Sequence, residues 1–170
     1  MNSFVIANPA RCIGCRTCLI ACVVAHSEEN IFLSKEKDIE FNPRLSVIRT
    51  ANVTGPIQCR QCENAACLNV CPNGSITSED GVITINKSTC IGCKTCAVAC
   101  PFGAISMAMV DDKVIANKCD LCKHRENGPA CVEICPTSVL KLVKADEIKA
   151  SISDKRISSL RDLAYLSNEI

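Results

Sequence analysis

Aromatic side chains are almost missing from this sequence, so they cannot fill its core. The 170 residues include no Trp, one Tyr and four Phe, and a chain of this length forms at most one or two small domains. No stretch approaches the roughly 20 apolar residues of a membrane helix. The first residues lack the basic segment, apolar run and cleavage site of a signal peptide. We therefore expect a cytoplasmic protein without a membrane span, held together by something other than aromatic packing.

Motifs of substrate chemistry are also missing. The sequence has no Gly-x-Gly-x-x-Gly fingerprint, no P-loop, and no acid and base arranged to act on an organic substrate. The formal net charge is only +1, and no basic patch interleaved with aromatic residues points to nucleic acid. The sequence therefore predicts neither an enzyme nor a nucleic-acid-binding protein.

Cysteine, in contrast, is abundant. It supplies 16 of the 170 residues, a level typical of disulfide scaffolds or metal proteins. Thiols stay reduced in the cytoplasm, which favours metal over disulfides. The cysteines form four groups: Cys12, Cys15, Cys18 and Cys22; Cys59, Cys62, Cys67 and Cys71; Cys90, Cys93, Cys96 and Cys100; Cys119, Cys122, Cys131 and Cys135. The first and third groups are compact, whereas the second and fourth have a longer gap in the middle.

The compact spacing is typical of [4Fe-4S] clusters. Cys-x-x-Cys-x-x-Cys brings three thiolates to one cluster, and the next cysteine ligates a neighbouring cluster in bacterial two-cluster proteins. Gly14 and Gly92 lie where such a loop needs freedom from Cβ. A proline follows the last cysteine of three groups, at Pro72, Pro101 and Pro136. These prolines end the preceding helical turn, whereas Val23 follows Cys22 and lets a helix continue there.

Zinc is the alternative to iron and sulfide. Paired Cys-x-x-Cys units also form zinc ribbons, so zinc stays open for the second and fourth groups taken alone. Their alternation with the two compact groups favours iron–sulfur clusters at all four. Each oxidised cluster carries a charge of about −2, so four of them would bring the chain to about −7.

Five other side chains near the cysteines could influence a cluster. They are His26, His124, Lys94, Lys118 and Lys123. The histidines could support the ligands or lie at the surface. The lysines could raise the potential of a nearby cluster or be solvated, so we predict a site at none of the five.

An internal repeat indicates two similar units. Residues 12–18 read Cys-Ile-Gly-Cys-Arg-Thr-Cys and return at 90–96 with Lys in place of Arg, which predicts a duplication. The first and second groups are separated by a longer segment than the others. We therefore expect an insertion at about 23–58, lying at the periphery.

The patterns between the groups predict short strands. Residues 45–49 alternate apolar and polar side chains, and 81–86 form a second candidate strand. Residues 105–110 and 114–115 flank Asp-Asp-Lys as in a hairpin. With short helices after the cysteine loops, the sequence predicts an α+β fold of tandem, ferredoxin-like units with small antiparallel ribbons.

The C-terminal part, 145–170, has no cysteine, Gly or Pro. Its apolar residues recur at helical spacing: Ile148, Ile152, Ile157, Leu160, Leu163, Leu166 and Ile170. This amphipathic helix could fold back over a cluster domain formed by 1–144. It could instead form an arm that docks on a partner or on other copies of the chain.

The cysteine motifs resemble those of a known family. They include 11–18, 59–63, 71–74 and 117–122 running to 128–131. Over about 1–143 the chain resembles the four-cluster, ferredoxin-like electron-transfer subunits of the molybdopterin oxidoreductase family. It is particularly similar to the small subunits of formate dehydrogenase H, formate hydrogenlyase and hydrogen-dependent carbon dioxide reductase.

The resemblance implies four [4Fe-4S] clusters in crossed pairs. The first set is Cys12, Cys15, Cys18 and Cys135; the second is Cys119, Cys122, Cys131 and Cys22; the third is Cys59, Cys62, Cys67 and Cys100; the fourth is Cys90, Cys93, Cys96 and Cys71. The segment after about 145 resembles the family least.

The same resemblance implies a non-catalytic subunit of an anaerobic oxidoreductase complex. Its expected partners are a formate dehydrogenase catalytic subunit, an iron hydrogenase subunit and other ferredoxin-like subunits. It would carry electrons for hydrogen-dependent CO2 reduction or for the reverse reaction. Two alternatives stay open, namely an electron-transfer subunit of another molybdopterin oxidoreductase and an iron–sulfur assembly or maturation factor.

Overall fold

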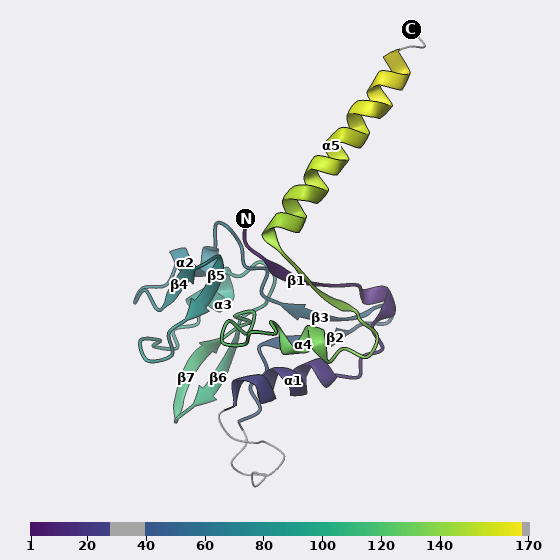
Figure 1. Ribbon diagram of the computed structural model, residues 1–170. Coiled ribbons are helices and arrows are strands. Elements are labelled where there is room, and N and C mark those ends of the chain that lie inside the picture. The colour runs from purple at the N-terminus through teal and green to yellow at the C-terminus, as the bar shows by residue number, and fades with distance from the viewer. Residues whose placement is uncertain (28–39, 168–170) are drawn as a thin grey trace.

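The computed structural model describes residues 1–27 and 40–167. Part of the expected insertion, 28–39, and the last apolar position of the C-terminal stripe, Ile170, lie outside the described residues. Within the described part, the strands pair into small antiparallel ribbons (Figure 1). The pairs are β1 (Phe4–Ala7) with β8 (Leu140–Val143), β2 (Leu45–Arg49) with β3 (Thr54–Gln58), β4 (Ile76–Glu79) with β5 (Val82–Ile85), and β6 (Ser106–Val110) with β7 (Lys113–Asn117).

The helices are η1 (Pro9–Arg11), α1 (Thr17–His26), α2 (Ala66–Asn69), α3 (Thr95–Ala99), α4 (Ala130–Glu133) and α5 (Ala145–Ser167). The four from α1 to α4 contain cysteines, and all but α5 are short. The predicted strands at 45–49 and 81–86 and the hairpin after 105 are confirmed by β2, β5 and the β6–β7 ribbon. The α+β class with short helices and antiparallel ribbons is confirmed as well.

The proline pattern also determines where the helices end. Three short helices end before or at the residue preceding a Cys-Pro pair, whereas α1 passes through Cys22 and continues to His26. Pairs of helices that are distant in sequence then come together, because α1 packs against α4 and α2 against α3. The first cysteine group is thereby placed beside the fourth, and the second beside the third.

Cysteine side chains take part in both hydrophobic cores. One core combines Val5, Leu45 and Leu140 with cysteines from three of the groups, and the other is built around Ile76 and Ile83. Removing apolar area from water stabilises a fold by about 25 cal/mol per Å², but these cores contain little beyond thin ribbons and sulfur. The buried cysteine side chains therefore contribute apolar area to both cores.

The expectation of a peripheral insertion is wrong for 45–58. Leu45 of β2 is only 7% exposed and belongs to the first core. Successive side chains of a strand point to opposite faces, so Leu45 and Val47 both reach this core. β3 then leads directly into Cys59, which means that the insertion supports the cysteine sites.

Helix α5 extends away from the rest of the chain (Figure 1). Two polar contacts hold its base: the Ala145 backbone N–H donates to Ser3 Oγ at 3.2 Å, and Lys141 pairs with Glu147 at 3.5 Å. Leu160 and Tyr165 are exposed. In the described residues, α5 therefore projects from the rest of the chain and does not fold over it, while docking of this helix on a partner or on other copies stays a prediction.

None of the helices in the described residues has both the length and the apolar character required to cross a membrane.

Gly92→Ala is expected to destabilise the fold more than Gly74→Ala. Both glycines have positive φ, which costs about 1–2 kcal/mol for a residue with Cβ. A Cβ on Gly92 would also lie 2.2 Å from the Val114 carbonyl oxygen, whereas one on Gly74 would meet nothing within 4 Å. The forced shift adds about 1–3 kcal/mol. Thermal unfolding of the two variants measures the difference, and equal unfolding temperatures would contradict it.

Candidate metal centres

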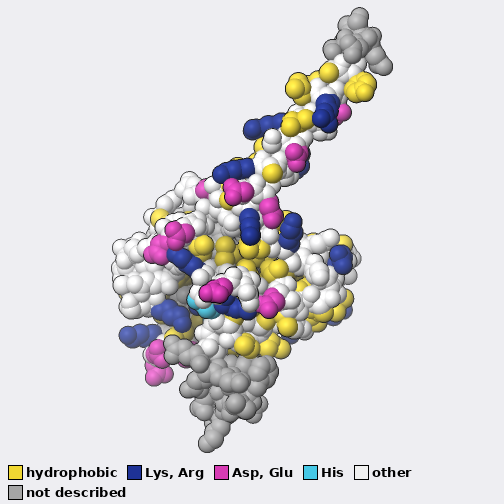
Figure 2. Space-filling view, in the orientation of Figure 1, with side chains coloured by type: hydrophobic (Ala, Val, Ile, Leu, Met, Phe, Trp, Pro, Cys, Tyr) yellow, Lys and Arg dark blue, Asp and Glu magenta, His cyan; other side chains and the backbone are white. Residues whose placement is uncertain are grey.

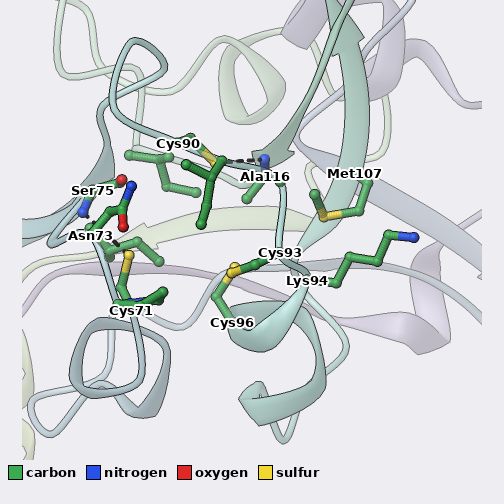
Figure 3. Close-up of a pocket in the computed structure, with 14 residues that line it drawn as sticks. Cys71, Asn73, Ser75, Cys90, Cys93, Lys94, Cys96, Met107 and Ala116 are labelled. Atoms are coloured by element: carbon green, nitrogen blue, oxygen red, sulfur yellow. Dashed lines mark hydrogen bonds between the residues drawn. The ribbon is translucent and has the colours of Figure 1, made fainter.

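Two hollows are each lined by four cysteines that come from two different groups. The first contains Cys71, Cys90, Cys93 and Cys96 in its wall, and Figure 3 shows these side chains surrounding one space. The second is lined by Cys12, Cys15, Cys18 and Cys135. In both hollows, three cysteines come from a compact group and the fourth is the last cysteine of a distant group.

The other eight cysteines approach one another closely enough to interact electrostatically. Burial raises the pKa of Cys119 most, and Cys131, Cys22 and Cys59 raise it further. Likewise, burial and then the charges of Cys59 and Cys100 raise the pKa of Cys62. These interactions place Cys22 near the fourth group and Cys100 near the second, although Cys119 also interacts with Cys59; the assignment of the eight cysteines to two crossed sets stays a prediction.

The two compact loops have the same local geometry. Gly14 and Gly92 have φ of +70° and +66°, and the residue before each helix is also left-handed, with φ of 63° at Arg16 and 68° at Lys94. A non-glycine residue at positive φ is uncommon and points to a functional constraint. Here the constraint turns successive thiols towards one space.

Threonine hydroxyls support one thiol in each compact loop. Thr17 Oγ1 donates to Cys15 Sγ at 3.3 Å, and Thr95 Oγ1 donates to Cys93 Sγ at 3.4 Å. These bonds lower the pKa of both thiols because a hydrogen bond to the charged form favours it. The repeat seen in the sequence therefore extends to hydrogen bonding at sulfur.

Backbone N–H groups support the cysteine of each Cys-Pro pair, which is the last cysteine of its group. The N–H four residues further on donates to Sγ in all three cases: Ser75 to Cys71 at 3.2 Å, Ala104 to Cys100 at 3.5 Å and Val139 to Cys135 at 3.3 Å. The turn that the proline starts brings this N–H to the sulfur. Although partial burial raises the pKa of Cys71 and Cys135, the N–H bonds lower it more.

Cys22 has no following proline and receives its N–H from elsewhere. The backbone N–H of Arg44, just before β2, donates to Cys22 Sγ at 3.3 Å. Because α1 continues past Cys22, the local turn found after the other three cysteines does not form. The insertion supplies the missing donor, which gives it a direct role in the site.

The longer groups use another shared turn. Gln61 and Leu121 have φ of 50° and 58°, and each donates its backbone N–H at 3.4 Å to the cysteine two residues before it, Cys59 or Cys119. This local geometry is the same in both loops. The first turn of the second group therefore matches the first turn of the fourth.

Burial makes several of these thiols unfavourable as free thiolates. It raises the pKa of Cys131 to about 12 and that of Cys22 to about 11. Iron binds the deprotonated thiolate, so metal binding must supply the positive charge that removes these protons. Thiols gathered in sets of four, with N–H and O–H donors aimed at sulfur, fit [4Fe-4S] clusters, whose sulfurs accept such bonds.

Asp120 joins the cysteine loops through a polar network. Its Oδ1 lies 3.0 Å from His26 Nε2 and accepts the Cys122 backbone N–H at 3.1 Å, while Oδ2 accepts from the Arg44 guanidinium. His26 Nδ1 in turn donates to the Cys22 carbonyl at 2.7 Å. Burial raises the pKa of Asp120, but His26 and Arg44 lower it overall. The network ties α1 to the loop of the fourth group.

His26 belongs to this network, and His124 lies beside it, with its ring against the His26 ring. Potential ligand atoms of His26, Asp120 and His124 lie within 4.8 Å of one another, and His124 Nε2 donates to the Ala25 carbonyl at 2.6 Å. Both Asp120 oxygens already have partners, so we assign no ion here. His26 supports the loop of a cysteine ligand, which was one of the two alternatives from the sequence.

Arg44, Asp120 and Gln61 were missed by sequence reasoning. Asp120 lies inside a Cys-x-x-Cys unit, where its carboxylate had no visible partner. Arg44 and Gln61 reach their partners only through the fold, at sequence separations of 76 and 58 residues. No periodicity or motif in the sequence marks such contacts.

Comparison with known families matches both halves of the site. A 4Fe-4S dicluster domain model matches 51–145, and a 4Fe-4S binding domain model matches 9–24. The chain is 45% identical to electron transport protein HydN of Escherichia coli K12, covering 92% of this chain and 96% of that protein. It is 47% identical to putative electron transport protein YsaA (88% and 94%) and 36% identical to hydrogenase-4 component A (92% and 89%), both from the same organism.

Asp120→Asn should destabilise the loaded protein by about 1.5–3 kcal/mol, the range for a hydrogen bond between charged groups. The amide removes the negative charge that faces His26 and Arg44 in a half-buried position. The measurement is the temperature at which cluster absorbance is lost.

Glu133→Gln is the matched control, because its ion pair with Arg125 at 2.8 Å is more exposed and such pairs contribute at most about 1 kcal/mol. Equal shifts in the two variants would contradict a special role for Asp120.

Proposed function

The chain belongs to the 4Fe-4S dicluster domain family, and from that premise we propose that it relays single electrons between a hydrogenase and a formate dehydrogenase. It is a non-catalytic electron-transfer protein, like the relatives named electron transport proteins. The relative named hydrogenase-4 component A supports the hydrogenase end. The resemblance of the cysteine motifs to formate dehydrogenase small subunits supports the other end.

The observation that carries this proposal is the crossed arrangement of the cysteines. We assign one [4Fe-4S] cluster to each of the four sets that the family resemblance implies. The two hollows support the first and fourth sets, and the mutual effects on thiol pKa support the second and third. Two crossed pairs in one small domain form a path with two ends, as a relay between two enzymes requires.

The clusters, when bound, supply one-electron redox chemistry. The chain's own residues hold the ligands and exclude water from the buried ones, such as Cys119 and Cys131. They also donate hydrogen bonds to sulfur, which stabilise negative charge there and tune the potential. No residue needs to donate or accept a proton, so the chain can serve either direction of hydrogen-dependent CO2 reduction.

We further propose that 1–144 arose by duplication of a ferredoxin-like unit and that 145–170 is a separate arm. The matched geometry of Arg16 and Lys94, and of Gln61 and Leu121, supports the duplication. We place the complex in the cytoplasm, where the sixteen free cysteines would stay reduced until iron binds.

The arm is proposed to dock on a subunit of the same redox complex. Apolar side chains and Lys or Arg lie together along α5 (Figure 2). A shallow groove on the helix is lined by Ile152, Leu160 and Leu163 beside Lys155 and Arg156. A partner surface with apolar pockets and acidic residues at their rim would complement this face. Pairing with another copy of the chain is the other outcome that the test below distinguishes.

Double substitutions test the crossed sets. Cys22→Ala and Cys131→Ala should each remove about four irons, and the double variant should also remove about four, because both cysteines belong to one set. Cys22→Ala with Cys135→Ala should instead remove about eight. Iron analysis of the purified chains measures this. A loss of about eight from the first pair would contradict the crossing.

Co-purification tests the relay and the arm together. The tagged full chain should capture formate dehydrogenase and hydrogenase subunits in fixed proportion. A chain lacking 146–170 should keep its iron content and cluster absorbance, since the hydrogen bond and the ion pair described for α5 join it to the body at its base, but should lose the captured partners.

The relay would be rejected if the full chain captured neither enzyme and were isolated alone with exchangeable clusters. Unchanged capture by the shortened chain would reject the docking role of the arm, and loss of self-association alone would assign the arm to pairing between copies.

A further inference from the structure

A lysine ammonium lies buried between the two pairs of cysteine sets. Lys118 directly follows β7 and is only 3% exposed. Its Nζ donates to the Cys119 carbonyl at 2.8 Å and to the Ile83 carbonyl. Lysine is almost never fully buried unless it is paired, so this position requires an explanation.

No carboxylate in the described part of the chain forms an ion pair with Lys118. Asp120 and Lys118 line one hollow, but the Asp120 oxygens are bonded to His26, Arg44 and the Cys122 N–H. Two carbonyl oxygens satisfy hydrogen bonds of the ammonium without neutralising its charge. A buried charge that is not compensated is strongly unfavourable. The compensating negative charge must therefore come from another group.

A loop of the third set lies beside the ammonium. Gln61 stands between Cys59 and Cys62, donates its backbone N–H to Cys59 Sγ at 3.4 Å, and bonds to the same two residues, Ile83 and Cys119, as Lys118 does. A fixed ammonium beside this loop favours added negative charge on a cluster held there. Lys118 is therefore placed to interact with the third set while its own backbone continues into Cys119 of the second.

Gln61 fixes the groups that hold the ammonium. It is 1% exposed, donates from Nε2 to the Cys119 carbonyl at 3.0 Å, and accepts the Ile83 N–H at 2.8 Å. Lys118 binds the carbonyls of the same two residues. Its charge is thus held by a rigid polar junction rather than by a mobile surface side chain, and a fixed charge in a dry site acts more strongly than a solvated one.

We propose that Lys118 is the buried counter-charge of the cluster held by Cys59, Cys62, Cys67 and Cys100. The reduction potential of this cluster is then higher than it is when an uncharged residue replaces Lys118. The inference rests on the ligand sets of the proposed function. Reduction adds one electron, delivered by the redox partner, and no proton moves. The added negative charge is stabilised by the ammonium, so electrons are favoured at the point where one pair of clusters meets the other.

A redox titration followed by electron paramagnetic resonance tests this in the loaded full chain. Lys118→Met and Lys118→Gln remove the charge, and the amide keeps a hydrogen-bond donor. Each should lower one midpoint potential, with a reduction equilibrium constant about tenfold smaller, which corresponds to about 59 mV for one electron. Lys118→Arg keeps the charge and should restore most of the potential.

Lys123→Met is the matched control, because Lys123 is more exposed and pairs with Glu79 and Asp80. It should leave all midpoint potentials unchanged. Loaded Lys118→Gln with wild-type potentials would overturn the proposal, as would an equal shift in Lys123→Met.

Loading defects are informative as well. If both uncharged variants lose about four irons while Lys118→Arg keeps them, the counter-charge is supported; if Lys118→Arg loses them too, it is rejected. Partner capture is measured separately with the same variants. Unshifted potentials with intact capture would reject the role of Lys118 and leave the proposed relay standing.

Discussion

Sulfur atoms that must carry negative charge inside a small protein determine most of this structure. Each set needs four thiolates, and several lie where burial disfavours a charge, as the raised pKa values of Cys22 and Cys131 show. The left-handed turns and Cys-Pro turns of the fold place N–H and O–H donors at these sulfur atoms. The ribbons and short helices are the minimum that holds these turns in place. Where the local turn is missing, at Cys22, a donor from Arg44 replaces it.

The sequence predicted the parts of the structure that local chemistry determines. Cysteine spacing and Cys-Pro pairs indicated where short helices end, and alternation at 45–49 indicated β2. The sequence could not show that β2 belongs to the core, because the contact of Leu45 with Val5 and Leu140 depends on how distant segments pack. The same holds for Lys118 and Gln61, which look like ordinary surface residues until the fold buries them. The apolar spacing of α5 likewise fitted both a helix folded over the rest of the chain and a projecting arm.

Polar side chains connect the separate cysteine loops into one body. The Asp120 network ties α1 to the fourth group, and the junction of Gln61 and Lys118 ties the second group to β5 and Cys119. Buried polar groups of this kind are stabilising only when every member is satisfied. Both networks lie beside proposed ligands. If Lys118 is the counter-charge proposed above, stability and redox tuning depend on the same residues.

The proposed relay requires sixteen cysteines that hold four clusters in crossed pairs. The most direct measurement is the iron and acid-labile sulfide content of the anaerobically purified chain. Four clusters predict about sixteen of each per chain, with an electron paramagnetic resonance signal of interacting [4Fe-4S] centres on reduction. About eight of each, or zinc in place of iron at the second and fourth groups, would contradict it.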